Sequence, residues 1–124
     1  MKKIITVLII ISILFGLYKL LSKNPATVGV NENEADLILF WGEGCPHCEK
    51  VKSFILDHQL DRKIKISYKE VYYLKENQQL LTETIKNCPE IDSSQGIGVP
   101  LGFVRNSHQC LYGDEPIIEW LNHQ

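Results

Sequence analysis

Apolar residues form one long uninterrupted run at the N-terminal end of the chain. Residues 4–21 read IITVLIIISILFGLYKLL and contain a single charged side chain, Lys19, near the end of the run. At about 1.5 Å per residue, a helix of this length reaches about 27 Å, which is enough to cross a bilayer core. A buried helix of a soluble core normally has a polar face, and this segment has none. We therefore expect residues 1–21 to be a membrane anchor.

A cleaved signal peptide is the alternative interpretation of this segment. The apolar stretch is longer than that of a usual signal peptide, and no A-x-A-like cleavage site follows closely, which favours a retained anchor. Lys2 and Lys3 precede the span, and a short basic N-terminus usually stays in the cytoplasm. We therefore expect the rest of the chain outside the cytoplasmic membrane, in an oxidising space where paired cysteines persist.

The remaining chain divides into a linker and a folded domain. Residues 22–35, SKNPATVGVNENEA, are polar and aperiodic and contain a proline and a glycine, which is typical of a linker. Residues 36–124 then form one small α/β domain. A covalent cross-link would help a domain of this size to be stable.

Hydrophobic periodicity in the domain predicts the element order β-α-β-α-β-β-α. The expected strands are Leu37–Trp41, Ile64–Tyr68, Leu101–Val104 and Cys110–Tyr112, and the expected helices are Pro46–Leu60, Leu74–Asn87 and Glu115–Asn122. We expect Asp114 to cap the last helix. A helix between the first two strands implies parallel pairing through a right-handed crossover, and the short turn between the last two strands implies a hairpin.

Composition excludes one class of partner and draws attention to the cysteines. The chain has 124 residues and a formal net charge of −2, with no basic stripe and no repeat, so nothing indicates a nucleic-acid partner. Of its four cysteines, Cys45 and Cys48 stand in the stretch WGEGCPHCEK. That stretch joins the first expected strand to the first expected helix.

The position of Cys45 at the start of a helix favours an ionised sulfur. Pro46 suits the first helical position, because the N–H that it lacks would have no partner there. The unpaired amides of the first turn and the helix dipole both favour a thiolate at Cys45. His47, when protonated, adds positive charge nearby. We therefore predict that the pKa of the Cys45 thiol lies below its free value of about 8.5.

Cys48 is one helical turn further on, on the same side of the helix, and we expect it to be less exposed. A thiolate at Cys45 can attack a substrate disulfide, and Cys48 can then attack the Cys45 sulfur and release the substrate. The reverse sequence oxidises a dithiol. A zinc site would need a second pair of ligands at close spacing, whereas the other two cysteines are single and far apart. We expect no metal and no cofactor.

Two motifs resemble the thioredoxin superfamily. FWGEGCPHC, residues 40–48, resembles the segment that leads from a strand into the active site of that family, with Trp41 where the family usually has an aromatic residue. The CPHC motif itself is similar to that of bacterial periplasmic disulfide-bond oxidases. GVPLGFV, residues 98–104, resembles the segment around the family's cis-proline. The resemblance covers residues 36–124 and implies a thioredoxin-like fold, with a mixed four-stranded sheet flanked by helices.

The resemblance also implies how a substrate is bound. It places Pro100, after a cis peptide bond, opposite the two cysteines, and it implies that the backbone of Val99 pairs with an extended substrate. A trans turn proline is the alternative at this position. Together with Trp41, these residues form the expected substrate-binding surface.

Two family features are missing. Many members have a buried acidic residue six positions before the first cysteine, and here that position is Leu39; Glu43, acting through water, is a candidate substitute. The periplasmic oxidases with a CPHC motif also have a large helical insertion before the cis-proline, for which this chain has no room. The membrane enzyme that usually reoxidises them is therefore not implied, and the redox partner is unidentified.

Cys88 and Cys110 are the remaining cysteines. Cys88 follows the second expected helix, about 20 Å long, which should carry it away from the active-site end of the domain. The strand after Pro100 should lead away from the same end, so Cys110, which opens the last strand, should also lie far from Cys45. Our hypothesis is a structural disulfide between them; two free buried thiols or a second redox relay are the alternatives.

These observations lead to one expected function with three alternatives. We expect a membrane-anchored thiol–disulfide oxidoreductase that acts on protein thiols and disulfides and tends towards oxidation, because a stabilised thiolate stabilises the reduced form. The alternatives are a reductant that serves cytochrome or metal-site assembly, a metallochaperone that holds metal on the two thiolates, and a redox-inert adaptor.

Overall fold

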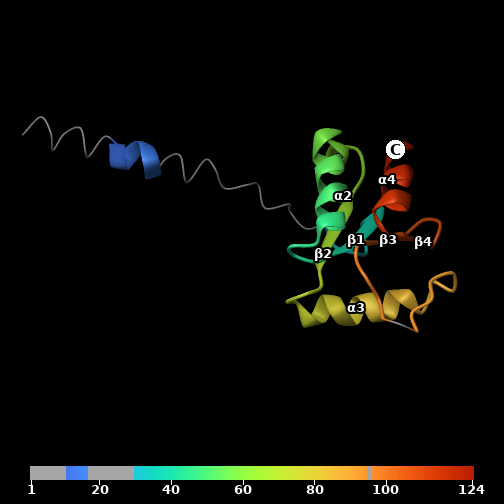
Figure 1. The fold of residues 1–124 in the computed structure, drawn as a ribbon. Coiled ribbons are helices and arrows are strands. Elements are labelled where there is room, and N and C mark those ends of the chain that lie inside the picture. The colour runs from blue at the N-terminus through green and yellow to red at the C-terminus, as the bar shows by residue number, and fades with distance from the viewer. Residues whose placement is uncertain (1–10, 17–29, 95) are drawn as a thin grey trace, which may run out of the picture.

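The computed structural model describes residues 11–16, 30–94 and 96–124. Its elements are the strands β1 (Leu37–Trp41), β2 (Ile66–Glu70), β3 (Leu101–Val104) and β4 (Gln109–Tyr112), the helices α2 (Pro46–Asp57), α3 (Lys75–Ile85) and α4 (Asp114–Asn122), and the short 3-10 helix η1 (Leu60–Arg62). In Figure 1, α2 and α4 cover one face of the sheet and α3 covers the other. The expected order of strands and helices is thus confirmed.

The four strands form one mixed sheet in the order β2-β1-β3-β4. β1 pairs with β2 in parallel and with β3 antiparallel, and β3 and β4 form an antiparallel hairpin. The crossover through α2 and the closing hairpin agree with the sequence prediction. Because β1 has a neighbour on each side, the turn that follows its carboxyl end begins from the middle of the sheet.

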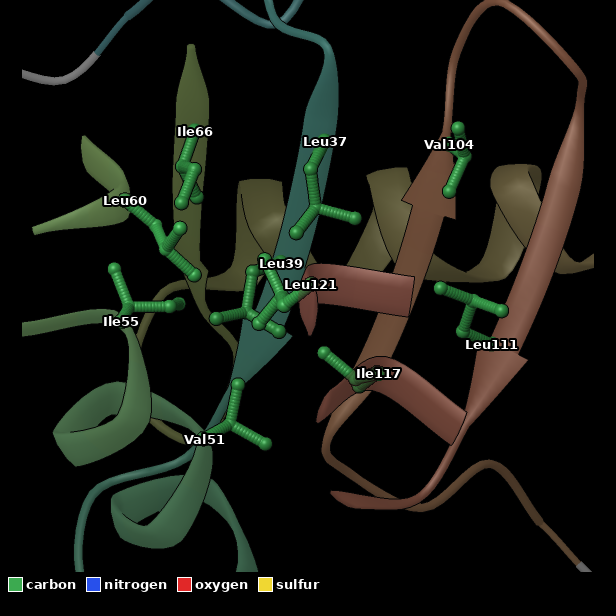
Figure 2. Close-up of a cluster of buried hydrophobic side chains, with 10 residues drawn as sticks. All are labelled: Leu37, Leu39, Val51, Ile55, Leu60, Ile66, Val104, Leu111, Ile117 and Leu121. Carbon is green, nitrogen blue, oxygen red and sulfur yellow. The ribbon is translucent and has the colours of Figure 1, made fainter. Parts of the chain in front are cut away.

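Alternate residues of β1 point to opposite faces of the sheet, so the domain has two hydrophobic cores. Leu37 and Leu39 belong to the core beneath α2 and α4, whereas Ile38 and Phe40 belong to the core above α3. All four side chains are buried, which explains why this strand is apolar at every position. Figure 2 shows the first core, whose side chains come from both helices and from every strand.

The predicted bounds of the first helix and of the second strand were wrong, and in both cases an apolar residue that packs on the core had been assigned to the element. The first helix ends at Asp57 rather than at Leu60, because Gln59 is in the left-handed region at φ 50°; Leu60 is buried in the core from η1 instead. The second strand is Ile66–Glu70 rather than Ile64–Tyr68. Ile64 also packs on the core from outside the strand. Apolar spacing at both positions therefore marked contact with the core rather than membership of the predicted helix or strand.

The helix expected over Leu74–Asn87 is shorter, spanning Lys75–Ile85 with Leu74 as its N-terminal cap.

The last residues of the expected linker, 30–35, lie against the domain. Ala35 is buried, Val30 packs on the second core, and Glu32 forms an ion pair with Lys69 of β2.

The expected anchor, residues 4–21, lies outside the described residues except for the short helical stretch 11–16. Among residues 11–16, 30–94 and 96–124, no helix has both the length and the apolar character needed to span a membrane.

Candidate active site

A tight turn between β1 and α2 places Cys45 at the first turn of the helix. Gly44 has φ 75°, a conformation that glycine adopts without strain. The N–H of Cys45 donates to the carbonyl oxygen of Gly42 at 3.3 Å. A Cβ at Gly42 would lie 2.4 Å from the ring of Tyr72, so a larger residue there would require that ring to move. Cys45 itself is the N-cap, in an extended conformation, and Pro46 is the first helical residue.

Cys45 and Cys48 are joined as a disulfide, with their Cα atoms 5.3 Å apart. The backbone N–H of Cys48 donates to the Cys45 sulfur at 3.2 Å. Cys45 retains 7% of its exposure, whereas Cys48 is completely buried. A first-turn amide therefore points at the outer sulfur, which is the sulfur that a partner can approach.

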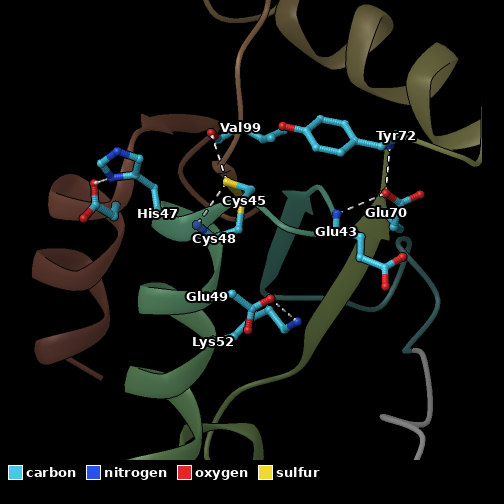
Figure 3. Close-up of a disulfide and its surroundings, with 10 residues drawn as sticks. Glu43, Cys45, His47, Cys48, Glu49, Lys52, Glu70, Tyr72 and Val99 are labelled. Carbon is cyan, nitrogen blue, oxygen red and sulfur yellow. Dashed lines mark hydrogen bonds and ion pairs between the residues drawn. A yellow bond between two sulfur atoms is a disulfide. The ribbon is translucent and has the colours of Figure 1, made fainter.

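The segment before β3 brings a proline loop against this disulfide. The peptide bond between Val99 and Pro100 is cis, and Pro100 is fully buried. The carbonyl oxygen of Val99 lies 3.7 Å from the Cys45 sulfur (Figure 3). The structure thus brings the two predicted motifs together.

A groove of about 340 Å³ begins beside Val99. Its walls come from the residues that follow β2, from α3 and from the proline loop, and they are Val71, Tyr72, Gln78, Leu81, Thr82, Ile97, Gly98 and Val99. In Figure 3 the hydroxyl end of Tyr72 points towards Val99. The groove therefore offers backbone groups and apolar side chains to a bound molecule next to the Cys45 sulfur.

Trp41, also expected at the substrate surface, is not part of this groove lining. It ends β1, and the ammonium group of Lys52 lies 4.0 Å from the centre of its ring. Lys52 is also paired with Glu49 at 3.0 Å. Trp41 therefore contacts α2 through a cation–π interaction with Lys52.

Glu70, the last residue of β2, forms hydrogen bonds with the loop after β1 and with the loop after β2. Its carboxylate accepts hydrogen bonds from the backbone N–H groups of Tyr72, Tyr73 and Glu43, at 2.8, 2.9 and 3.4 Å. Desolvation opposes the charge, but these donors outweigh it and lower the pKa of Glu70 from its ordinary 4.5. Glu43, a candidate proton carrier, is exposed and contributes its backbone to this network.

Glu70→Gln should destabilise the domain by about 1 kcal/mol at neutral pH, because one anionic acceptor for several amides is lost. A lowered pKa means that this contribution is present above pH 4.5 and is lost as the pH falls through the lowered value. Urea unfolding of both proteins between pH 7 and pH 2 should show the difference shrinking as Glu70 itself is protonated. A difference of the same size at every pH would contradict this role.

Leu39 occupies the position where a buried acidic residue was considered. It is fully buried among the apolar side chains of the first core, with Val51 and Ile55 of α2.

In the part of the chain that the structure describes, no three His, Cys, Asp or Glu side chains are grouped to hold a metal ion.

His47 of α2 is held by a residue that sequence reasoning assigned a different role. Its Nδ1 lies 3.0 Å from one oxygen of Asp114, and the ammonium group of Lys50 lies 2.7 Å from the other. The predicted cap role of Asp114 was wrong: Gly113, at φ 91° and ψ 170°, is the N-cap of α4, and Asp114 is the first helical residue. No sequence signal connects Asp114 to α2, since only the packing of α4 against α2 brings them together.

Cys88 and Cys110 form the second disulfide, with Cα atoms 5.8 Å apart. Both are buried in the core above α3. Cys110 pairs with Phe103, towards the end of β3 that lies away from Pro100. This disulfide is therefore separate from the candidate active site.

Comparisons of the chain with models of protein families, with curated proteins and with solved structures found no significant match.

Proposed function

We propose that this chain is a thiol–disulfide oxidoreductase of the thioredoxin superfamily that exchanges disulfides with proteins through Cys45 and Cys48. The observation that carries the proposal is the position of the Cys45 sulfur. It sits at a strand-to-helix junction, receives a first-turn amide and faces the carbonyl group that precedes a cis-proline. The mixed sheet with helices on both faces is compatible with the thioredoxin-like fold.

The proposed oxidation of a substrate dithiol takes two steps. A substrate thiolate attacks the Cys45 sulfur, the bond to Cys48 breaks, and Cys48 leaves as a thiolate that takes up a proton. A second substrate thiolate then attacks the first substrate sulfur and releases Cys45 as a thiolate. The substrate loses two electrons and gains a disulfide, and the Cys45–Cys48 pair is left reduced.

The groove supports the proposed mode of substrate binding. An extended peptide can form hydrogen bonds with the backbone of Val99 and lay its side chains over Ile97 and Tyr72. A substrate cysteine held there would be close to the Cys45 sulfur, because Val99 is adjacent to both. Residues 4–21 would anchor the enzyme in the cytoplasmic membrane with the domain on the extracytoplasmic side.

Equilibration of the full chain with glutathione buffers tests the proposal. We expect the Cys45–Cys48 bond to form and break reversibly, and the oxidised chain to introduce disulfides into a reduced, unfolded protein. Transfer in the opposite direction alone would indicate a reductant. Stoichiometric metal bound to reduced protein, without disulfide transfer, would indicate a metallochaperone and contradict the proposal.

A further inference from the structure

The first turns of α2 and α4 lie side by side next to the disulfide, and one carboxylate connects them. Asp114 directs one oxygen at His47 and the other at Lys50. Its side chain keeps only 12% of its exposure, whereas those of His47 and Lys50 keep 70% and 58%. The carboxylate is thus the fixed member of the group, and the two basic side chains are held against it.

Among the carboxylates near His47 and Lys50, Asp114 is the one that contacts both side chains. Lys50 has its pKa raised, and Asp114 has its pKa lowered, each first by their mutual hydrogen bond. Glu115, next on α4, acts on Lys50 only through its charge. On α2, Glu49 is paired with Lys52 instead. Asp114 is therefore ionised at neutral pH and offsets the positive charge of Lys50.

The same positive charge would otherwise act on the Cys45 sulfur. His47 is two residues after Cys45, and Lys50 is in the next turn. A cation near the first turn stabilises a thiolate there, and a stabilised thiolate makes the disulfide more oxidising. In Figure 3 the His47 ring lies away from the Cys45 sulfur and is hydrogen-bonded to the carboxylate of Asp114.

We propose that Asp114 is a positioning residue that limits the oxidising strength of the Cys45–Cys48 pair, by holding His47 against α4 and by neutralising Lys50. This inference rests on the proposed function. It predicts that loss of the carboxylate charge leaves His47 and Lys50 free to stabilise the Cys45 thiolate.

The test is the redox equilibrium of the full chain with glutathione, measured for the unmodified protein and for Asp114→Asn. The variant should become more oxidising by about two- to fivefold in the equilibrium constant, the range expected for one charge near a helix terminus. Fivefold corresponds to about 20 mV for a two-electron couple. The rate of Cys45 alkylation against pH should shift to lower pH in parallel.

Three further variants separate this role from a structural one. Asp114→Glu should restore most of the original equilibrium, and Glu115→Gln, which removes a neighbouring charge without these contacts, should move it less than Asp114→Asn does. In a His47→Ala background the effect of Asp114→Asn should shrink. Loss of stability alone would affect oxidised and reduced forms equally and leave the equilibrium constant unchanged.

The outcomes distinguish this inference from the proposed function. A reversible couple in the unmodified chain, with an unchanged or more reducing Asp114→Asn variant, would overturn the inference and leave the proposed function standing. Absence of a reversible couple in the unmodified chain would overturn both.

Discussion

Cys45→Ser should abolish disulfide transfer, whereas Cys48→Ser should stop the reaction half-way. Cys45 has the outer sulfur, the first-turn amide and the neighbouring Val99 carbonyl group, so its loss removes the atom that a substrate reaches. Cys48 is completely buried, and in the proposed mechanism it resolves the intermediate. Without it, reduced Cys45 can still attack a substrate disulfide, but the mixed disulfide has no internal thiol to release it.

Mass spectrometry of each variant after exposure to a disulfide-containing peptide measures this difference. Cys48→Ser should gain one covalently attached peptide at Cys45, and Cys45→Ser should gain none. Turnover by Cys45→Ser should not exceed that of the Cys45→Ser/Cys48→Ser double variant, which is the control for background exchange. Attachment of the peptide to Cys48 in Cys45→Ser would contradict the assigned roles.

Removal of the second disulfide should lower stability strongly and leave the redox equilibrium of the active pair unchanged. Cys88 and Cys110 close a loop with a sequence separation of 22 residues, for which the chain-entropy model gives about 3 kcal/mol. The double variant Cys88→Ala/Cys110→Ala suits this test, because both sites are buried and alanine introduces no unpaired polar group.

Urea unfolding of the oxidised full chain provides the measurement. The matched control is the unmodified chain in which only Cys45 and Cys48 are reduced. It shows how much stability the domain loses when the other disulfide is opened instead. Equal stability of the double variant and the unmodified protein would show that the second disulfide does not stabilise the domain. A changed glutathione equilibrium at Cys45–Cys48 would contradict the separation of the two disulfides.

The region around the candidate site was predictable because its signals are local. A strand that is apolar at every position, a glycine turn and a proline at the first helical position set Leu37–Trp41 and the start of the helix at Pro46 as the structure has them. The boundaries of Leu101–Val104 also match. Each of these follows from residues within a few positions of one another.

What the sequence did not predict depends on contacts between distant segments. The register of β2 is set by its pairing with β1. The sequence does not show that Leu60 packs on the core from a 3-10 helix, or that Ile64 packs on it from outside the strand. The cluster of His47, Lys50 and Asp114 arises only when α4 packs on α2. Gly113, at φ 91°, is the N-cap, so α4 begins at Asp114, one residue earlier than expected.

The rate of alkylation of Cys45 as a function of pH, in the full chain with Cys45 and Cys48 reduced, tests the central claim most directly. Because the thiolate is the reacting species, the midpoint of this profile reports the pKa of the thiol. A sulfur held by the first turn of α2 should give a midpoint below about 8.5, the value of a free cysteine. A midpoint at or above that value would contradict the account.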